Sequence, residues 1–425
     1  MISRRTFLGT MSVGLGTLIV SGCASNNEID NTLPKPIAAL SSMSDKVRPI
    51  TVSERSQRLE HAKKLMKANK LDAILLMGGT SLDYFTGIRW GISERLLAIV
   101  ITQKGNPFIV CPAFEEDRAM EQIEKGPMAG TASVLTWQEH ENPYRLIVQG
   151  LRESGIVTGN VGVEETVRFV FSDGLSKETN TLSIMSATPV TAGCRVVKGE
   201  NEIYLMRLAS EVTLKAYTAA YNAIEVGMTQ EEVGRLISDA HKQLGFSGYA
   251  SVQVGKYAAL PHGSTTPQVV KEGVPILIDG GCGVSGYRSD VSRTFVIGKA
   301  SDKAKEVFNI VLEAQTAALN VARPGIEAQK IDAAGRKVIE DAGYGPDYKY
   351  FTHRLGHGIG MDGHEWPYLV KGNKTILKPG MTFSDEPGIY IPEEFGVRLE
   401  DELLITENGA ELLTPQSYSL ENPFA

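Results

Sequence analysis

The chain has little cysteine, little histidine and no excess of positive charge. Its 425 residues include four cysteines, seven histidines and three tryptophans. So few cysteines exclude a disulfide framework, and the fold must therefore be held by a hydrophobic core. Lysine and arginine total 43 against 50 aspartates and glutamates, and the formal net charge is −7. This balance argues against nucleic acid as a partner and against general adhesion to anionic membranes.

The remaining composition is that of an ordinary globular protein. Hydrophobic residues make up 42% and charged residues 22% of the chain, and the length predicts about two domains. Cys111, Cys194 and Cys282 show no spacing typical of a zinc site. We expect all three to be small buried thiols.

Residues 1–23 have the layout of an export signal. Arg4 and Arg5 stand in SRRTFLG, and a mildly apolar run rich in Gly, Ser and Thr follows. The arginine pair indicates the twin-arginine route. The run ends in VSGC, which resembles a bacterial lipoprotein signal, in which the cysteine is lipidated. We therefore expect a periplasmic lipoprotein whose only membrane contact is a lipid anchor at Cys23. A transmembrane anchor is the alternative, but the run is short and weakly apolar for a bilayer span.

Two domains are expected after a flexible tether. Residues 24–50 are rich in Asn, Ser and Pro, as in flexible linkers. Residues 51–190 alternate helix-like and strand-like segments, which predicts an α/β domain. It opens with a helix capped by Ser53 and includes two strands around a turn at residues 105–107. Residues 191–425 begin with a long helix and then alternate helices with short strands.

The stretch VPILIDGGCGVSGYRSDVSRTFVIG predicts a β-hairpin. Two alternating apolar segments flank the sequence GVSG, which would form a four-residue loop. Pairing Cys282 with Tyr287 places Asp279 opposite Asp290 on one face of the hairpin. Facing carboxylates repel each other unless a cation lies between them. The alternative is that one aspartate faces solvent and the other lies in a turn.

A similar pattern recurs in SDEPGIYIPEEFGVRLEDELLIT. Two arms centred on Glu393 pair Ile391 with Phe395, and this register places Glu386 opposite Glu400. Prolines interrupt the ladder, so this hairpin is less regular than the first. Four carboxylates in apolar strands are costly to bury unpaired, and a bound metal explains them best.

Three of the seven histidines, His353, His357 and His364, lie within twelve residues in FTHRLGHGIGMDGHEWP. Histidine is the commonest metal ligand and proton carrier at neutral pH. Two divalent cations would balance four carboxylates, and one histidine would complete a two-metal hydrolase site with ions about 3.5–4 Å apart. The residues alone leave open which histidine is the ligand.

The order of these motifs resembles that of the pita-bread metallopeptidases. GHGIG, EPGIYIP and GVRLEDELLITENGAELLT are similar to blocks of the Xaa-Pro peptidases, prolidase and aminopeptidase P. SLDYFTGIRW and RVVKGENEIYLMRLA resemble an N-terminal block and the domain junction of the same enzymes. The resemblance implies an α+β fold, with a creatinase-like α/β domain followed by a pita-bread catalytic domain.

The resemblance also assigns residues, position by position. The implied metal ligands are Asp279, Asp290, His357, Glu386 and Glu400. The implied catalytic residues are His262, His353, His364, Glu386 and Arg398. Arg398 lies two residues before Glu400 and is expected either to orient Glu400 or bind a substrate carboxylate, or to form only a supporting ion pair. His61, His140 and His241 match nothing in the family and are expected at the surface.

The implied activity is hydrolysis of Xaa-Pro bonds in short proline-containing peptides, as in a dipeptidase or an aminopeptidase P. The hard ligand set favours Mn²⁺, with Co²⁺, Fe²⁺ or Zn²⁺ as the other ions considered. We also expect a homodimer. One alternative is a metal-dependent hydrolase or lyase of a small amine or osmolyte, because relatives of that kind share the fold. Another is a non-catalytic envelope protein that binds peptides.

Overall fold

The structure is a computed structural model that describes residues 33–424. The predicted export signal, the anchor at Cys23 and the first part of the predicted tether lie outside the described residues. Within residues 33–424, no helix combines the length and the hydropathy that a membrane crossing needs.

The described part of the predicted tether is packed against the protein. It contains helix α1 (Lys35–Ala38) and a 3₁₀ turn, η1 (Ser44–Lys46). Ile37 and Met43 are buried, and the Met43 N–H donates to the carbonyl oxygen of Leu244 at 2.9 Å. The prediction of a flexible tether is therefore wrong from α1 onward, because the polar composition conceals two apolar side chains that reach the core.

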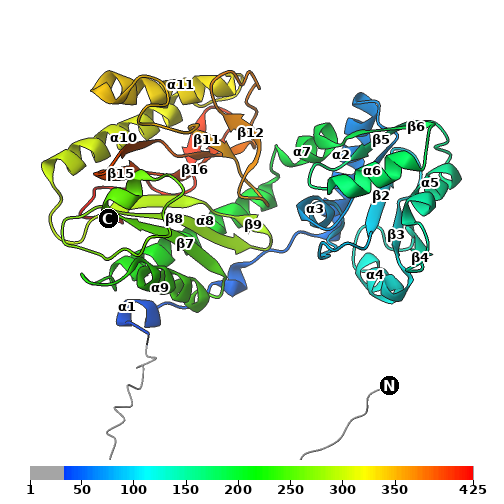
Figure 1. The fold of residues 1–425 in the computed structure, drawn as a ribbon, viewed down its shortest axis with the longest axis horizontal. Helices are drawn as coiled ribbons and strands as arrows, with labels where there is room; N and C mark the ends of the chain where they lie inside the picture. The colour runs from blue at the N-terminus through cyan, green and yellow to red at the C-terminus, as the bar shows by residue number, and fades with distance from the viewer. Residues whose placement is uncertain (1–32, 425) are drawn as a thin grey trace, which may run out of the picture. The chain divides into compact units, whose positions relative to one another are not determined.

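The first half of the chain folds around a six-stranded sheet with strand order β4-β3-β2-β1-β5-β6 (Figure 1). Its elements, in chain order, are α2 (Val52–Ala68), β1 (Ala73–Leu76), α3 (Thr80–Thr86), β2 (Ala98–Thr102), β3 (Phe108–Pro112), η2 (Ala113–Glu115), α4 (Glu116–Ile123), β4 (Ser133–Trp137), α5 (Pro143–Glu153), β5 (Gly159–Val163), α6 (Phe169–Lys177), β6 (Leu182–Ser186) and α7 (Thr188–Arg195). β2 and β3 are antiparallel, as predicted around residues 105–107. The cap of α2 is Thr51 rather than Ser53, because Thr51 forms a reciprocal capping box with Glu54.

The second half begins with a long helix, as predicted, and carries three further sheets. Its elements are α8 (Glu200–Tyr221), α9 (Gln230–Gln243), β7 (Gly248–Val254), η3 (Gly255–Ala259), β8 (Ile276–Val284), β9 (Tyr287–Arg288), β10 (Val291–Phe295), α10 (Asp302–Val321), α11 (Ala328–Ile339), the π-helical turn η4 (Glu340–Tyr344), β11 (Gly356–Gly358), β12 (Glu365–Leu369), β13 (Thr382–Asp385), β14 (Gly388–Ile391), β15 (Phe395–Arg398), β16 (Asp401–Ile405) and β17 (Ala410–Leu412). The predicted domain boundary after residue 190 falls inside α7 rather than in an irregular linker.

Two of the three sheets of the second half are covered by helices. α8 and α9 share a hydrophobic core with β7, β8 and β10, through residues such as Tyr217, Ile237 and Ile278. α10 and α11 share a second core with the sheet β12-β11-β13-β16-β17. A single bridge between Ser292 and Glu400 joins the two sheets. The predicted metal ligands lie on both sides of this junction, and the architecture confirms the predicted α+β class.

Candidate metal centre

The first predicted hairpin forms with a shifted register. β8 and β9 are joined by a two-residue turn at Ser285 and Gly286, whose φ values are 51° and 93°. Positive φ at both positions is typical of a type I′ turn, which suits the twist of a hairpin better than the predicted four-residue loop. As a result Asp279 pairs with Ser292 and not with Asp290. The shift is an even number of residues, so both aspartates keep the face on which they were predicted.

The second predicted hairpin has the predicted register. β14 and β15 pair Ile391 with Phe395 around Glu393, which has a φ of 62°. β13 and β16 continue the same register on the other side of the prolines and pair Asp385 with Asp401. Glu386 and Glu400 occupy the gaps between these paired strands. At these two positions the strand pairing is interrupted, and the side chains of both glutamates reach the junction between the sheets.

The five predicted ligands converge at this junction. His357, Glu386 and Glu400 form one group whose ligand atoms lie within 4.8 Å of one another, and Asp279, Asp290 and Glu400 form another. Glu400 belongs to both groups and therefore links them. An arrangement of two groups that share a carboxylate suits a pair of neighbouring cations.

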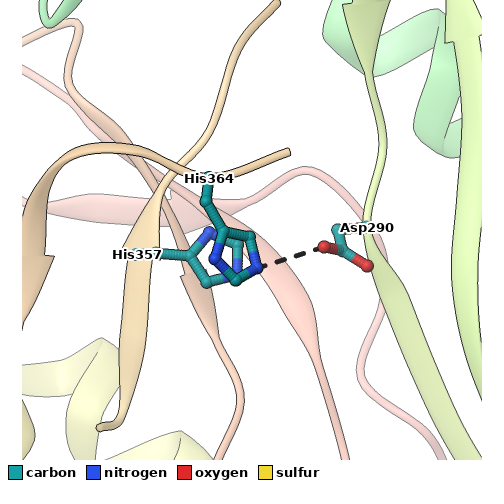
Figure 2. A group of neighbouring side chains, drawn as sticks. All are labelled: Asp290, His357 and His364. Carbon is teal, nitrogen blue, oxygen red and sulfur yellow. Dashed lines mark ion pairs between the residues drawn. The ribbon is translucent and has the colours of Figure 1, made fainter. Parts of the chain in front are cut away.

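His357 presents one ring nitrogen to the carboxylates. Its Nδ1 lies 3.2 Å from the carbonyl oxygen of Gly358, so Nδ1–H donates there and Nε2 keeps its lone pair. Nε2 lies 3.2 Å from Glu386 Oε1 and 4.0 Å from Asp290 Oδ2. Figure 2 shows the imidazole pointing from its strand toward Asp290, with the ring of His364 over it. A backbone acceptor that orients the free nitrogen is the usual support for a metal-binding histidine.

The carboxylates of the site repel one another, and burial and this repulsion shift their pKa values. Burial, with the Asp279 carboxylate beside it, raises the pKa of Asp290 to about 7. Burial and the neighbouring acids also raise the pKa of Glu400 well above its usual value. Burial acts in the same direction on Glu386, but His357, His353 and Arg398 together outweigh it and lower the pKa of Glu386 to about 2. Four carboxylates and one imidazole cannot all remain unprotonated here without added positive charge, so the donor set fits hard divalent cations.

Arg398 supports the site and is itself fully engaged. Its Nη2 donates to Asp279 Oδ2 at 2.6 Å, and its Nε donates to Ser292 Oγ at 3.0 Å. Its Nη1 donates to the Tyr390 hydroxyl and to the carbonyl oxygen of Pro261. Of the predicted alternatives, the geometry favours the supporting ion pair, and its acid is Asp279.

His353 lies beside the carboxylates but is held by the protein. Its Nδ1 is 2.8 Å from the carbonyl oxygen of Arg354, and its Nε2 is 2.6 Å from the Tyr390 hydroxyl. Nδ1 is also 3.9 Å from Glu386 Oε2. Because both ring nitrogens have partners, His353 positions Tyr390 and one wall of the site rather than offering a free donor. Burial lowers the pKa of His353 and keeps it neutral.

His364 and His262 are the exposed histidines of the site. Both line a cavity of about 610 Å³ together with all five predicted ligands. The ring of His364 stacks on that of His357, with centroids 3.7 Å apart, and His364 forms a third close group with Asp290 and His357. Desolvation and the nearby His357 lower the pKa of His364 to about 4. A neutral imidazole at physiological pH can therefore face a substrate in this cavity.

Of the three histidines expected at the surface, His61 and His140 are exposed. His241 is not, and that prediction is wrong: its side chain is buried in α9, where Nδ1 lies 2.9 Å from the carbonyl oxygen of Ile237. Cys111, Cys194 and Cys282 are buried thiols, as predicted.

Sequence reasoning missed three hydroxyl groups of the site. Ser292 Oγ lies 2.9 Å from Asp279 Oδ1 and 2.6 Å from Glu400 Oε2. Ser384 Oγ donates to Glu386 Oε1 at 3.0 Å, and the Tyr390 hydroxyl joins Arg398 to His353. Ser292 and Ser384 each stand two residues from a predicted ligand in an apolar strand. A polar residue on the same strand face as a ligand was the available signal.

Comparison with known proteins identifies the family of the chain. Residues 204–407 match the model of metallopeptidase family M24, and residues 58–197 match the creatinase/prolidase N-terminal domain. A Xaa-Pro dipeptidase of Pyrococcus furiosus is 32% identical over 361 residues, which cover 84% of this chain and 97% of that protein.

Solved structures show the same relationship. Dipeptidase PepE from Mycobacterium ulcerans has a TM-score of 0.82 at 31% identity, over 88% of this chain and 99% of that one. An X-Pro aminopeptidase from Thermotoga maritima has a TM-score of 0.69 at 28% identity, over 83% and 97% of the two chains. The chain therefore belongs to metallopeptidase family M24, and it is an enzyme that carries a creatinase/prolidase N-terminal domain ahead of its metallopeptidase domain.

Proposed function

We propose that the enzyme hydrolyses Xaa-Pro bonds in short peptides and that it holds two divalent cations for this reaction. The observation that carries the proposal is the convergence of Asp279, Asp290, His357, Glu386 and Glu400 on one wall of the cavity. Relatives over most of the chain are named Xaa-Pro dipeptidase and X-Pro aminopeptidase. Four carboxylates match the charge of two divalent ions, which supports the dinuclear form.

Metal chemistry suits a bond to proline. The X–Pro amide has no N–H. A peptidase that binds its substrate through a hydrogen bond from the scissile N–H therefore cannot make that bond at proline. Bound divalent cations supply an acidified water and a polarised scissile carbonyl. The substrate therefore needs no backbone donor at the scissile nitrogen.

The side chains of the site then divide the remaining work. Glu386 accepts the proton of the attacking water, and the Ser384 hydroxyl holds Glu386 Oε1 in place at 3.0 Å. His364 and His262 lie on the exposed wall, where an imidazole N–H donates to the developing oxyanion. Arg398 orients Asp279, and His353 with Tyr390 orients Arg398. The proton taken by Glu386 passes to the proline nitrogen as it leaves.

Metal analysis and a substrate pair test this function. The purified enzyme should contain close to two divalent ions per chain and cleave Ala-Pro much faster than Ala-Ala. Chelation should remove the activity. An enzyme that binds metal but cleaves neither peptide would contradict the Xaa-Pro proposal and favour a small amine substrate.

We further propose Mn²⁺ as the activating ion. The predicted ligands are four carboxylates and one imidazole with no thiolate, and hard ligands of this kind suit Mn²⁺. Reactivation of the chelated enzyme should be better with Mn²⁺ than with Zn²⁺, Co²⁺ or Fe²⁺. Best reactivation by Zn²⁺ would contradict the choice of metal without affecting the ligands.

Export as a periplasmic lipoprotein and assembly as a homodimer are proposals that rest on the sequence. Cys23→Ser should release the protein from the membrane, and Arg4→Lys with Arg5→Lys should block export. Membrane-attached, normally exported protein in both variants would contradict the targeting proposal. Light scattering of the soluble Cys23→Ser form should give the mass of two chains.

A further inference from the structure

His364 lies at the end of a glycine-rich loop between β11 and β12. Residues 358–364 read GIGMDGH, so three of these seven residues are glycines. Glycine has no side chain to restrict its backbone, and such a loop needs contacts to keep one conformation. The exposed ring of His364 stacks on His357 and meets Arg354 Nη2 at 3.2 Å. Its place in the cavity therefore also depends on how the loop is held.

The first part of the loop is held by the metallopeptidase domain. Arg288 of β9 donates through its backbone N–H to the carbonyl oxygen of Gly360 at 2.8 Å, and through Nε to that of Met361 at 3.1 Å. The N–H groups of Met361 and Asp362 donate to Glu365 Oε1 at 2.9 Å and 3.1 Å. The loop thus folds around the buried carboxylate of Glu365.

The second part of the loop is held by the N-terminal domain. Asp362, two residues before His364, accepts a hydrogen bond from the Thr80 hydroxyl of α3. Its other carboxylate oxygen accepts from Arg195 Nη2 of α7 at 2.6 Å. Arg195 also pairs with Glu365, the residue that follows His364. Both donors belong to the part of the chain that matches the creatinase/prolidase N-terminal domain.

The chain just after His364 is held by the same domain. Trp366, two residues further on, donates through its indole N–H to Glu165 Oε2 at 3.1 Å. The Thr188 hydroxyl at the start of α7 donates to the same oxygen at 3.3 Å. Glu165, Arg195 and His364 line one small cavity of about 20 Å³. Side chains on both sides of His364 are therefore bonded to a domain other than the one that carries the metal ligands.

We infer that Thr80 and Glu165 are positioning residues, through which the N-terminal domain holds His364 where it donates to the developing oxyanion. This inference rests on the proposed function and gives the N-terminal domain a part in the chemical step. The donor from His364 is used as charge develops on the scissile carbonyl oxygen, so a displaced ring lowers kcat and leaves KM largely unchanged. A displacement of about 1 Å costs roughly 100-fold in rate.

The test uses the metal-loaded full chain with Ala-Pro as substrate. Thr80→Val combined with Glu165→Ala removes one hydrogen bond on each side of His364, at residues that do not line the catalytic cavity. This double variant should lower kcat by roughly 10- to 100-fold and change KM by less than about 3-fold. Its metal content should equal that of the wild-type enzyme. Thr80→Ser combined with Glu165→Gln keeps a donor and an acceptor at the two positions and should restore most of kcat.

A mutant cycle shows whether the effect passes through His364. In a His364→Ala background, Thr80→Val with Glu165→Ala should change kcat by less than about 2-fold, because the ring that the two residues position is gone. Thr131→Val is the control. It removes a hydroxyl of the same domain that donates to the carbonyl oxygen of Met128 at 3.0 Å, and it should leave kcat unchanged in both backgrounds.

Hydrogen exchange gives a readout that does not depend on turnover. In the double variant the backbone amides of residues 359–366 should exchange faster than in the wild-type enzyme, with or without metal, because the loop opens more often. The other strands of the metallopeptidase domain should exchange at the wild-type rate, and Thr131→Val should leave the loop unchanged.

Three results would overturn the inference. Wild-type kcat in the double variant would show that the contacts of Thr80 and Glu165 do not position the ring. An equal loss of kcat with and without His364 would show that the substitutions act through the fold. A loss mainly in KM would show that they act on substrate binding. If the wild-type enzyme does not cleave Ala-Pro, the proposed function itself is wrong and the inference falls with it.

Discussion

Two buried clusters of charge in this enzyme differ in how their charges balance. In one, Arg195 and Lys198 contact Glu365, and Arg195 also contacts Asp362 at 2.6 Å. Two cations thus face two carboxylates. In the metal centre, four carboxylates face one guanidinium, that of Arg398. The first cluster is neutral by itself, and the second is not.

The pKa values follow this difference. Burial alone raises the pKa of Glu365, yet Lys198 and Arg195 lower it to about 2. In the metal centre, burial and neighbouring acids raise the pKa of Asp290 and of Glu400. A balanced cluster needs no added ion to keep its groups charged, whereas the carboxylates of an unbalanced one repel each other until a cation binds. The imbalance therefore distinguishes a binding site from a structural ion pair.

The largest expected effect comes from the unbalanced cluster. Glu386→Gln removes the proton acceptor and a predicted ligand, so kcat/KM for Ala-Pro should fall by roughly 1000-fold or more. Circular dichroism should show an intact fold. The matched control is Glu393→Gln, the same change at the tip of the same hairpin, where the side chain is 83% exposed. An activity within about tenfold of wild type in Glu386→Gln would argue against the assigned role.

Stability should respond with opposite sign in the two clusters. Glu365→Gln leaves Arg195 and Lys198 without a counter-charge and should cost about 3–5 kcal/mol of unfolding free energy, with or without metal. Glu400→Gln in the metal-free enzyme removes a repelled carboxylate and should raise stability by on the order of 1 kcal/mol. Urea unfolding with chelator and with Mn²⁺ measures both. Destabilisation of the metal-free enzyme by Glu400→Gln would show that the Glu400 carboxylate is not repelled by its neighbours in the folded state.

Histidine variants should show which histidine of the metal centre is a metal ligand. His357→Ala should lose bound metal, because its free Nε2 faces Glu386 and Asp290. His364→Ala should retain metal and lower kcat by about 100-fold through loss of a donor to the oxyanion. Metal content by mass spectrometry and kcat for Ala-Pro distinguish the two. The reverse pattern would make His364 the ligand.

The smallest expected effect is a pH dependence of the metal-free enzyme. The pKa of Asp290 rises from 3.8 to about 7 on folding. Its contribution to stability is therefore complete below about pH 4 and is lost as the pH rises toward 7. The stability of wild type relative to Asp290→Asn should fall by about 1–2 kcal/mol over that range, since the side chain is partly exposed. Mn²⁺ should reverse the trend, because it binds the ionised carboxylates and therefore stabilises the folded enzyme more as the pH rises. A difference that is flat or rises with pH in the metal-free enzyme would contradict the raised pKa.

Much of the site could be predicted from local patterns. Alternating apolar residues place Asp279 and Asp290 on strands, and the register through Ile391 and Phe395 aligns Glu386 with Glu400. The register of the first hairpin could not be predicted, because the positive φ of Ser285 selects a tighter turn. The error left the metal-facing side unchanged, since a shift of two residues preserves the face of every side chain.

The sequence by itself determined which side chains are candidate metal ligands. The spacing of the acids in strands indicated the four carboxylates, and the resemblance of the motifs added His357. Only the tertiary structure decided how they are held: Ser292 between Asp279 and Glu400, and Arg398 against Asp279. It also decided that His241 is buried and that the segment from α1 onward is packed through Ile37 and Met43. These contacts join residues far apart in the chain. Periodicity reports the face on which a side chain lies, and the partner across that face depends on how the sheets pack.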